Sequence, residues 1–283
     1  MEPLLLIGGT GTVGSATAAV LSARGIVATI AARRPPPGGL TLDLARPETL
    51  AAARGHTTAL LVTGLGPDET ARTLAAIEAL RQAGIGRFVF LSIMNVVAMR
   101  QIPHFEAKIP IRQALLADGE STVLEANFFQ SNDRMCLPAI IGAGSYPLPV
   151  GETGVWPIAP ADLGEAVANA LTDRRWAGGA FPLCGPERMT GASLASNWAD
   201  RLGRPVSYAG DEVAGFAAMA TQGIPDEAAA FRDWLRHDME TMMRVTQAMG
   251  CPATPAEVAQ SEALVGRPLT RHRDYIQTLE VAT

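Results

Sequence analysis

A glycine-rich turn near the N-terminus constrains the fold of this chain more than any other feature. Gly8, Gly11 and Gly14 are spaced G-x-x-G-x-x-G. The turn follows the apolar run Leu4–Ile7 and precedes a helical pattern at residues 12–24. In such a turn the first glycine permits a tight bend, the second lets the backbone approach a pyrophosphate, and the third lets the helix pack against the sheet. The strand before and the helix after favour a dinucleotide-binding loop over an ordinary glycine-rich turn.

The predicted phosphate loop runs from Gly8 to Gly14, so it also contains Thr10, Thr12 and Val13. The free N–H groups at the start of the following helix bind phosphate, and the partial positive charge of that helix end favours an anion. The hydroxyl groups of Thr10 and Thr12 can add hydrogen bonds. We therefore expect all of these residues to contact a dinucleotide.

The end of the second predicted strand selects between the two nicotinamide cofactors. NAD-binding sheets place Asp or Glu there to bind the ribose hydroxyls. This chain instead has Arg33 and Arg34, whose guanidinium groups can bind phosphate oxygens in a forked geometry. The two arginines predict NADP(H), with a solvated arginine pair as the alternative. Asp43 and Leu44, at the end of the third strand, are expected beside the adenine.

Short apolar strands alternate with amphipathic helices in the first half of the chain, as in parallel sheets built from βαβ units. The predicted strands lie at residues 4–7, 26–32, 40–44, 59–63, 87–92 and 122–126, and the predicted helices at 12–24, 47–54, 68–83 and 104–118. The expected fold class is α/β, a doubly wound, mostly parallel Rossmann sheet with a smaller, mainly helical C-terminal substrate lobe.

The pattern changes after residue 135. Residues 135–160 are rich in Pro and Gly and are predicted to form a loop that crosses between lobes. A helix at 160–172 and a strand at 180–184 follow, and further helices are predicted at 191–202, 211–221, 226–248, 254–264 and 269–279. We divide the chain into an NADP-binding domain at 1–150 and a substrate lobe at 151–283, with strands of the second part returning to the main sheet.

Composition argues against several other classes of protein. The formal net charge is −5, and the chain lacks the basic stripe of a nucleic-acid binder. It also lacks a cationic leader and an apolar run of membrane-spanning length, so we expect a cytoplasmic protein without a membrane partner. Cys136, Cys184 and Cys251 form no metal-binding pattern and are expected to be buried thiols. Both a monomer and a homodimer remain open.

The order of several motifs resembles the NmrA-like family of atypical short-chain dehydrogenases/reductases. The resemblance spans nearly the whole chain and rests on Gly8–Gly14, Arg33, Arg87–Ser92, His104–Lys108, Leu124–Asn132, Trp156–Leu171 and Leu183–Arg204. It implies an NAD(P)-binding Rossmann fold. The family includes quinone and azo-dye reductases, isoflavone-type and lignan ether reductases, and cofactor-sensing regulators without catalytic activity.

His104 and Lys108 occupy the positions of the Tyr-x-x-x-Lys pair of conventional short-chain dehydrogenases. The resemblance implies that Lys108 binds the nicotinamide ribose. Lys108 is also the sole lysine of the chain, which favours a role that arginine cannot fill. His104 departs from the pattern, and it is either a general acid or a surface histidine at a helix start.

Residues at the ends of the central strands are expected to line the ligand crevice. Ser92 ends the fifth strand and is either a hydrogen-bonding group of the site or a strand cap. Thr63 and Gly64, after the fourth strand, should flank the nicotinamide. Asn127 and Phe128, after the sixth strand, are similar to the family stretch that borders nicotinamide and substrate, although Phe128 can equally be core.

The C-terminal part supplies large apolar side chains: Phe216, Met219, Phe231, Trp234, Leu235, Met239, Met242 and Met243. They suit a pliable pocket wall, although helix packing is the simpler interpretation for most of them. No cationic cluster accompanies them, so we expect a neutral, apolar or aromatic small-molecule substrate. Asp238 and Glu240 are expected to be solvated.

The sequence therefore favours an NADPH-dependent reductase that delivers hydride to a quinone, an enone, an azo compound or a related acceptor. The predicted catalytic residues are Lys108, His104 and Ser92, with the proton coming from His104, Lys108 or water. Two alternatives stay open. One is a cofactor-sensing regulator without turnover, and the other is a non-redox isomerase or cyclase on the same fold.

Overall fold

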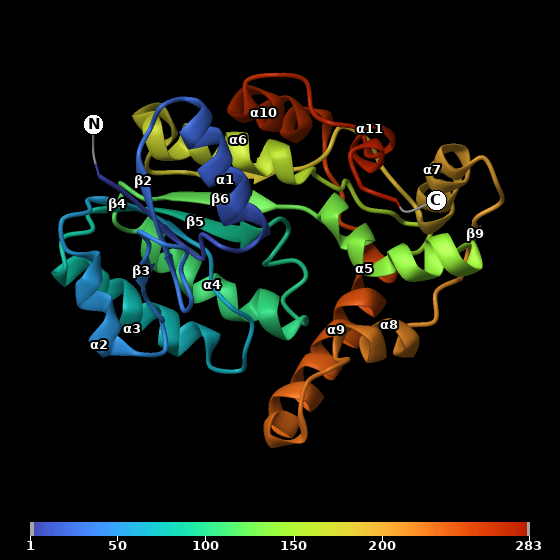
Figure 1. Cartoon of the computed structure of the whole chain (residues 1–283), viewed down its shortest axis with the longest axis horizontal. Helices are drawn as coiled ribbons and strands as arrows, with labels where there is room; N and C mark the ends of the chain where they lie inside the picture. The colour runs from blue at the N-terminus through green and yellow to red at the C-terminus, as the bar shows by residue number, and fades with distance from the viewer. Residues whose placement is uncertain (1–2, 282–283) are drawn as a thin grey trace.

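Seven parallel strands form the main sheet of the structure, a computed structural model that describes residues 3–281 (Figure 1). Their spatial order is β3-β2-β1-β4-β5-β6-β8. The strands are β1 Leu4–Ile7, β2 Ala28–Ala32, β3 Leu40–Thr41, β4 Thr58–Leu61, β5 Arg87–Ile93, β6 Thr122–Ala126 and β8 Ala180–Leu183. The order reverses between β1 and β4, which is the switch point where doubly wound sheets bind ligands. The predicted fold class is confirmed.

Helices cover both faces of this sheet (Figure 1). One face carries α1 Thr12–Ala23, α6 Pro160–Thr172 and α10 Pro255–Val265; the other carries α2 Pro47–Leu50, α3 Glu69–Gln82 and α4 Pro103–Leu116. Residues of β1 divide between the faces, since Leu4 and Leu6 pack with α1 and α6 while Leu5 and Ile7 pack with α2, α3 and α4. Strand alternation thus explains why every residue of β1 is buried.

Helices α1 and α6 approach each other closely at a glycine. A Cβ atom on Gly164 would lie 2.8 Å from the carbonyl carbon of Ala16, so only glycine permits this packing. Strand β8 pairs with β6 in parallel, with Leu124 opposite Phe181. Elements from the second half of the chain therefore complete the main sheet, and the division at residue 150 stays a prediction.

A smaller lobe lies beside the carboxyl ends of the strands (Figure 1). It contains α5 Asp133–Pro138, β7 Ser145–Tyr146, α7 Gly191–Leu202, β9 Ser207–Tyr208, α8 Ala214–Ala220, α9 Ala229–Met249 and α11 His272–Gln277. A buried carboxylate joins several of these elements, because Asp133 accepts hydrogen bonds of 2.7 Å from Tyr146, Trp198 and His272.

Several predicted boundaries are wrong. Residues 135–160 are only partly a loop, because α5 continues into a π-helical turn at Ala139–Ala143 before β7. The third strand is limited to Leu40–Thr41, and the helix predicted at 269–279 is limited to His272–Gln277. In residues 3–281 no helix is both long and apolar enough to cross a membrane.

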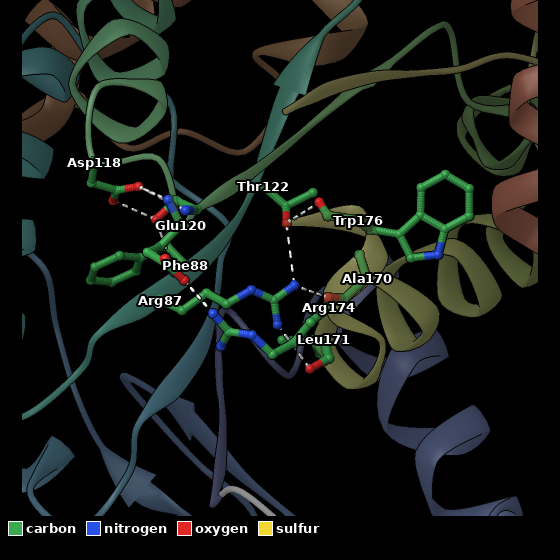
Figure 2. Close-up of polar contacts among 10 residues, drawn as sticks. Arg87, Phe88, Asp118, Glu120, Thr122, Ala170, Leu171, Arg174 and Trp176 are labelled. Carbon is green, nitrogen blue, oxygen red and sulfur yellow. Dashed lines mark hydrogen bonds and ion pairs between the residues drawn. The ribbon is translucent and has the colours of Figure 1, made fainter. Parts of the chain in front are cut away.

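A polar cluster fastens the amino end of β5 to the end of α6 (Figure 2). The buried guanidinium of Arg87 donates hydrogen bonds to the carbonyl oxygens of Ala170 and, at 3.2 Å, of Leu171. It also donates to the hydroxyl of Thr122 at 3.3 Å, and that hydroxyl donates at 2.7 Å to the carbonyl of Trp176. Arg87 thus satisfies carbonyl groups that the last turn of a helix leaves without partners.

Candidate active site

The glycine loop has the geometry that its spacing predicted. Gly8 has φ +80°, which favours glycine, and its N–H donates to the carbonyl of Ala31 at 3.1 Å. A Cβ on Gly14 would lie 2.3 Å from the carbonyl oxygen of Gly8, so α1 begins against the turn. Gly11 is the N-cap of α1 and no side chain caps it, which leaves the first N–H groups of the helix for a ligand. The side chain of Val13 is buried, so only its backbone can contact a cofactor.

A groove of about 620 Å³ extends from this loop along the carboxyl ends of the strands. Gly8, Thr10 and Gly11 line one part of it, and Asp43, Leu44, Thr63 and Gly64 line the remainder. The structure therefore brings the residues predicted for the adenine side and for the nicotinamide side into one continuous depression. Sequence reasoning missed Arg72 and did not place Phe231 there, and both also line the groove.

Arg33 and Arg34 lie at one end of this groove. They form, with Thr10 and Ala32, a crevice of about 420 Å³. Both side chains are exposed, and among residues 3–281 neither guanidinium has an ion-pair partner. Guanidinium groups placed in this way can bind phosphate oxygens, so the geometry is compatible with the predicted phosphate site.

A second cavity, of about 280 Å³, adjoins the groove, because Val62, Thr63 and Leu65 line both. The ends of β5 and β6 form its floor, α4 forms one wall, and Met242 and Thr246 of α9 close it. Most of its lining is apolar. This cavity brings together predicted site residues from distant parts of the sequence, namely Ser92, His104, Lys108, Asn127 and Phe128.

Lys108 is held in a buried ion pair that the sequence did not reveal. Its ammonium forms a short contact with Glu69 of α3 and donates to the hydroxyl of Thr63 at 3.0 Å. Thr63 in turn donates to Glu69 at 2.6 Å. Glu69 is fully buried, and one of its oxygens, Oε2, has no hydrogen-bond partner among the described residues. An ammonium has three donors, so Lys108 keeps one for a ligand.

His104 is bound to Asp238 of α9, and the expectation that Asp238 is solvated is wrong. Asp238 is fully buried, and its two oxygens accept from the backbone N–H of His104 at 2.9 Å and from the imidazole Nδ1 at 2.6 Å. A carboxylate can only accept, so Nδ1 carries the proton. Among residues 3–281, Nε2 has no partner, and His104 lines the cavity.

Two other cavity residues differ in how their polar groups are used. The hydroxyl of Ser92 is buried and has no hydrogen-bond partner within residues 3–281. The amide of Asn127 is fully engaged, since it donates to the carbonyl of Cys251 at 2.9 Å and accepts from the N–H groups of Phe128 and Trp156 at 2.8 and 3.1 Å. The hydroxyl of Ser92 is therefore available to a ligand, whereas the amide of Asn127 holds together the segments that form the cavity wall.

The remaining ionisable residue of the cavity is Cys251. Burial disfavours its thiolate and raises the pKa of the thiol to about 12. All three cysteines are buried and free, as expected. No cluster of three or more potential metal ligands occurs within residues 3–281.

Comparison with known proteins gives consistent matches. The model of the NmrA-like family matches residues 40–271. An NAD(P)H azoreductase from Xenophilus azovorans is 30% identical, over 92% of this chain and 98% of its own. A (4-alkanoyl-5-oxo-2,5-dihydrofuran-3-yl)methyl phosphate reductase from Streptomyces griseus is 29% identical, over 96% of each chain. The structure of an NADPH-dependent quinone oxidoreductase from Escherichia coli in complex with NADPH has a TM-score of 0.79 and 20% identity, over 97% of this chain and 98% of that one.

Proposed function

Because the chain belongs to the NmrA-like family, we propose that it is an NADPH-dependent reductase that delivers hydride to an uncharged apolar or aromatic acceptor. One observation carries this proposal most directly. The apolar cavity of about 280 Å³ adjoins the groove below the glycine loop, so that an acceptor in the cavity would lie beside a nicotinamide in the groove. The names of the azoreductase and quinone oxidoreductase relatives support the same class of reaction.

The residues of the groove fit NADP(H). The start of α1 and the loop from Gly8 to Gly14 would hold the pyrophosphate, and the unpaired Arg33 and Arg34 would hold the 2′-phosphate. The third donor of Lys108 would bind the nicotinamide ribose. When bound, the reduced nicotinamide supplies the hydride and its two electrons.

The charges of the cavity favour an uncharged acceptor. Among residues 3–281, Lys108 is the only residue lining this cavity with a fixed positive charge, and Glu69 already neutralises it. An anionic substrate would therefore find no unpaired fixed cation there, which argues against a phosphate ester of the kind that the Streptomyces relative reduces. Quinones, enones and azo compounds are uncharged and meet the polar Ser92 and His104 within an otherwise apolar wall.

The buried hydroxyl of Ser92 supports a hydrogen bond to the acceptor or the nicotinamide amide. Burying a hydroxyl without a partner costs about 1–3 kcal/mol, so a ligand atom that bonds to Ser92 recovers a penalty present in the free protein. This supports a binding role for Ser92 over a role as a strand cap.

The first experiment measures binding and turnover separately. NADPH fluorescence should change on binding, and NADPH should be consumed with members of a panel of quinones, enones and azo dyes. Tight binding without consumption across the panel would reject the reductase and favour the cofactor-sensing regulator. Isomerisation or cyclisation of a substrate without net NADPH consumption would instead favour the non-redox alternative.

A second experiment tests the lysine. Lys108→Arg keeps the charge but replaces a compact ammonium within a buried pair, so we expect turnover to fall at least tenfold. Arg24→Lys, at a partly exposed pair with Glu165 at the C-terminal end of α1, is the control for a general effect of basic substitution. Unchanged NADPH binding and turnover in Lys108→Arg would remove Lys108 from the site.

A further inference from the structure

We propose that Asp238 is a positioning residue that holds His104 as the proton donor of the reaction, with the proton delivered from Nε2. This inference rests on the proposed function. It assigns the source of the transferred proton, for which the sequence allows His104, Lys108 or water. It also makes α9 of the small lobe part of the active site.

The geometry sets the orientation of the imidazole. Asp238 accepts from the backbone N–H of His104 through one oxygen and from Nδ1 through the other. These two contacts fix both the ring and its proton, because the carboxylate has no proton to give. The ring of Phe105 packs edge-on against the imidazole with centroids 4.7 Å apart, which restricts rotation further. Nε2 is therefore the nitrogen left for a ligand in the cavity.

The other ionisable groups around this imidazole are less suitable donors. Lys108 is engaged with Glu69 and Thr63, and loss of its proton would leave the buried carboxylate of Glu69 without a cation. Cys251 has a pKa raised to about 12 by burial, so its thiol is a weak acid. Asp238 itself is an acceptor at both oxygens. His104 is the remaining group that can donate and be reprotonated by water.

Reduction of a quinone takes up one hydride and one proton. The acceptor gains a hydride from the reduced nicotinamide, which is thereby oxidised, and one quinone oxygen becomes an anion. The imidazolium Nε2–H bond breaks as that oxygen takes the proton, giving the hydroquinone. Neutral His104 keeps its Nδ1 proton against Asp238 and regains a proton at Nε2 from water. Asp238 stabilises the imidazolium but touches no reacting atom.

The substitution Asp238→Asn tests this arrangement without changing the shape of the side chain. The backbone N–H of His104 requires an acceptor, so the amide oxygen takes that site and the amide NH₂ faces Nδ1. Nδ1 must then accept, which moves the neutral-state proton to Nε2. Nitrogen-15 NMR of the ligand-free protein reads this change directly. We expect a protonated Nδ1 in the wild type and a protonated Nε2 in the variant.

The kinetic effect should be confined to proton transfer. General acid catalysis typically contributes about 10²–10⁴-fold, so we expect Asp238→Asn to lower kcat by about 100-fold with unchanged NADPH affinity. His104→Asn keeps a donor for Asp238 but removes Nε2, and its loss should be similar. The double variant should lose no more than either single variant, since the two residues act as a unit.

The choice of acceptor sharpens the test. A halogenated quinone gives a strongly acidic hydroquinone that needs no proton from the protein, whereas an alkylated quinone gives a weakly acidic one. The loss in Asp238→Asn should be large for the alkylated quinone and small for the halogenated one. Asp233→Asn, at an exposed position of the same helix, is the matched control and should leave both rates unchanged.

The outcomes separate the two proposals. An equal loss of kcat with both quinones, or a wild-type kcat in Asp238→Asn, overturns the role of the Asp238–His104 pair. Either result leaves the proposed reductase function intact. An unprotonated Nδ1 in the wild-type protein also overturns it. Absence of turnover by the wild type with every acceptor overturns the reductase and the proton assignment together.

Discussion

The two ends of strand β5 carry buried polar side chains that are treated in opposite ways. At the amino end, Arg87 donates to the last carbonyl groups of α6 and to Thr122. At the carboxyl end, Ser92 is equally buried and its hydroxyl has no partner among residues 3–281. The guanidinium at the amino end has partners within the protein, as most buried polar groups do, whereas the hydroxyl at the carboxyl end, which we propose binds a ligand, has none among the described residues. On the proposed function, this difference separates scaffold from site on a single strand.

The largest expected effect is on stability at the amino end. Arg87→Met removes charged donors from buried carbonyl groups and should lower the free energy of unfolding by about 3 kcal/mol. Urea denaturation measures this change. NADPH affinity and kcat should stay unchanged below the transition. Arg46→Met, at an exposed ion pair with Glu48, should change the free energy of unfolding little. An equal cost for both variants would contradict the scaffold role of Arg87.

The next effect is on cofactor choice. Each charge-assisted hydrogen bond contributes about 1.5–3 kcal/mol, so Arg33→Ala or Arg34→Ala should weaken NADPH binding by about 10- to 100-fold. NADH binding and the free energy of unfolding should not change, because both side chains are exposed and have no ion-pair partner among residues 3–281. Fluorescence titration with both cofactors measures the ratio of the dissociation constants for NADPH and NADH. An unchanged preference would reject the arginine pair as the 2′-phosphate site.

Ser92→Ala should not lower the free energy of unfolding, in contrast to Arg87→Met. Removing an unpartnered buried hydroxyl should leave the free energy of unfolding equal or raise it by about 1 kcal/mol. Loss of its hydrogen bond to the ligand should lower kcat/KM about fivefold to tenfold. Urea denaturation and steady-state kinetics on the same preparation give both values. A clear loss of stability would place Ser92 with the scaffold.

The smallest effect concerns Cys251, which lines the cavity but whose thiol stays protonated at neutral pH. Its pKa is raised from 9.0 to about 12 by burial, so the folded state favours the neutral thiol. The stability that this provides is present below pH 9.0 and is lost as the pH rises toward about 12. Stability should therefore fall less between about pH 8 and about pH 10 in Cys251→Ala than in the wild type. Identical pH dependence of the two proteins would contradict the shift.

Sequence periodicity predicts most of the sheet, because buried parallel strands and the helices between them have distinct patterns. The glycine loop and Arg33 are also predictable, since a nucleotide site at the switch point uses residues adjacent to strand ends. The region at 135–143 is not predictable in this way. Pro138 and Gly144 suggest a loop, yet packing of Cys136 and Ile140 in the core maintains helical structure there.

The partners of the site residues lie beyond the reach of sequence patterns. Asp238 lies 134 residues from His104, and Glu69 lies 39 residues from Lys108. Both acids occur in helices with ordinary polar faces, and nothing in their local sequence distinguishes a buried carboxylate from a solvated one. Only the packing of α9 and α3 against α4 brings these charges together, so their roles depend on tertiary structure.

Helix α9 places Asp238 on the same element as Met242 and Thr246, which line the cavity. The group that would orient the proposed proton donor and the groups that would shape the proposed acceptor site thus belong to one helix. Repacking this helix to admit a new substrate would also disturb the proposed acid, so a change in substrate range would affect proton transfer. Directed evolution of this protein should vary residues 242 and 246 while keeping 238 fixed.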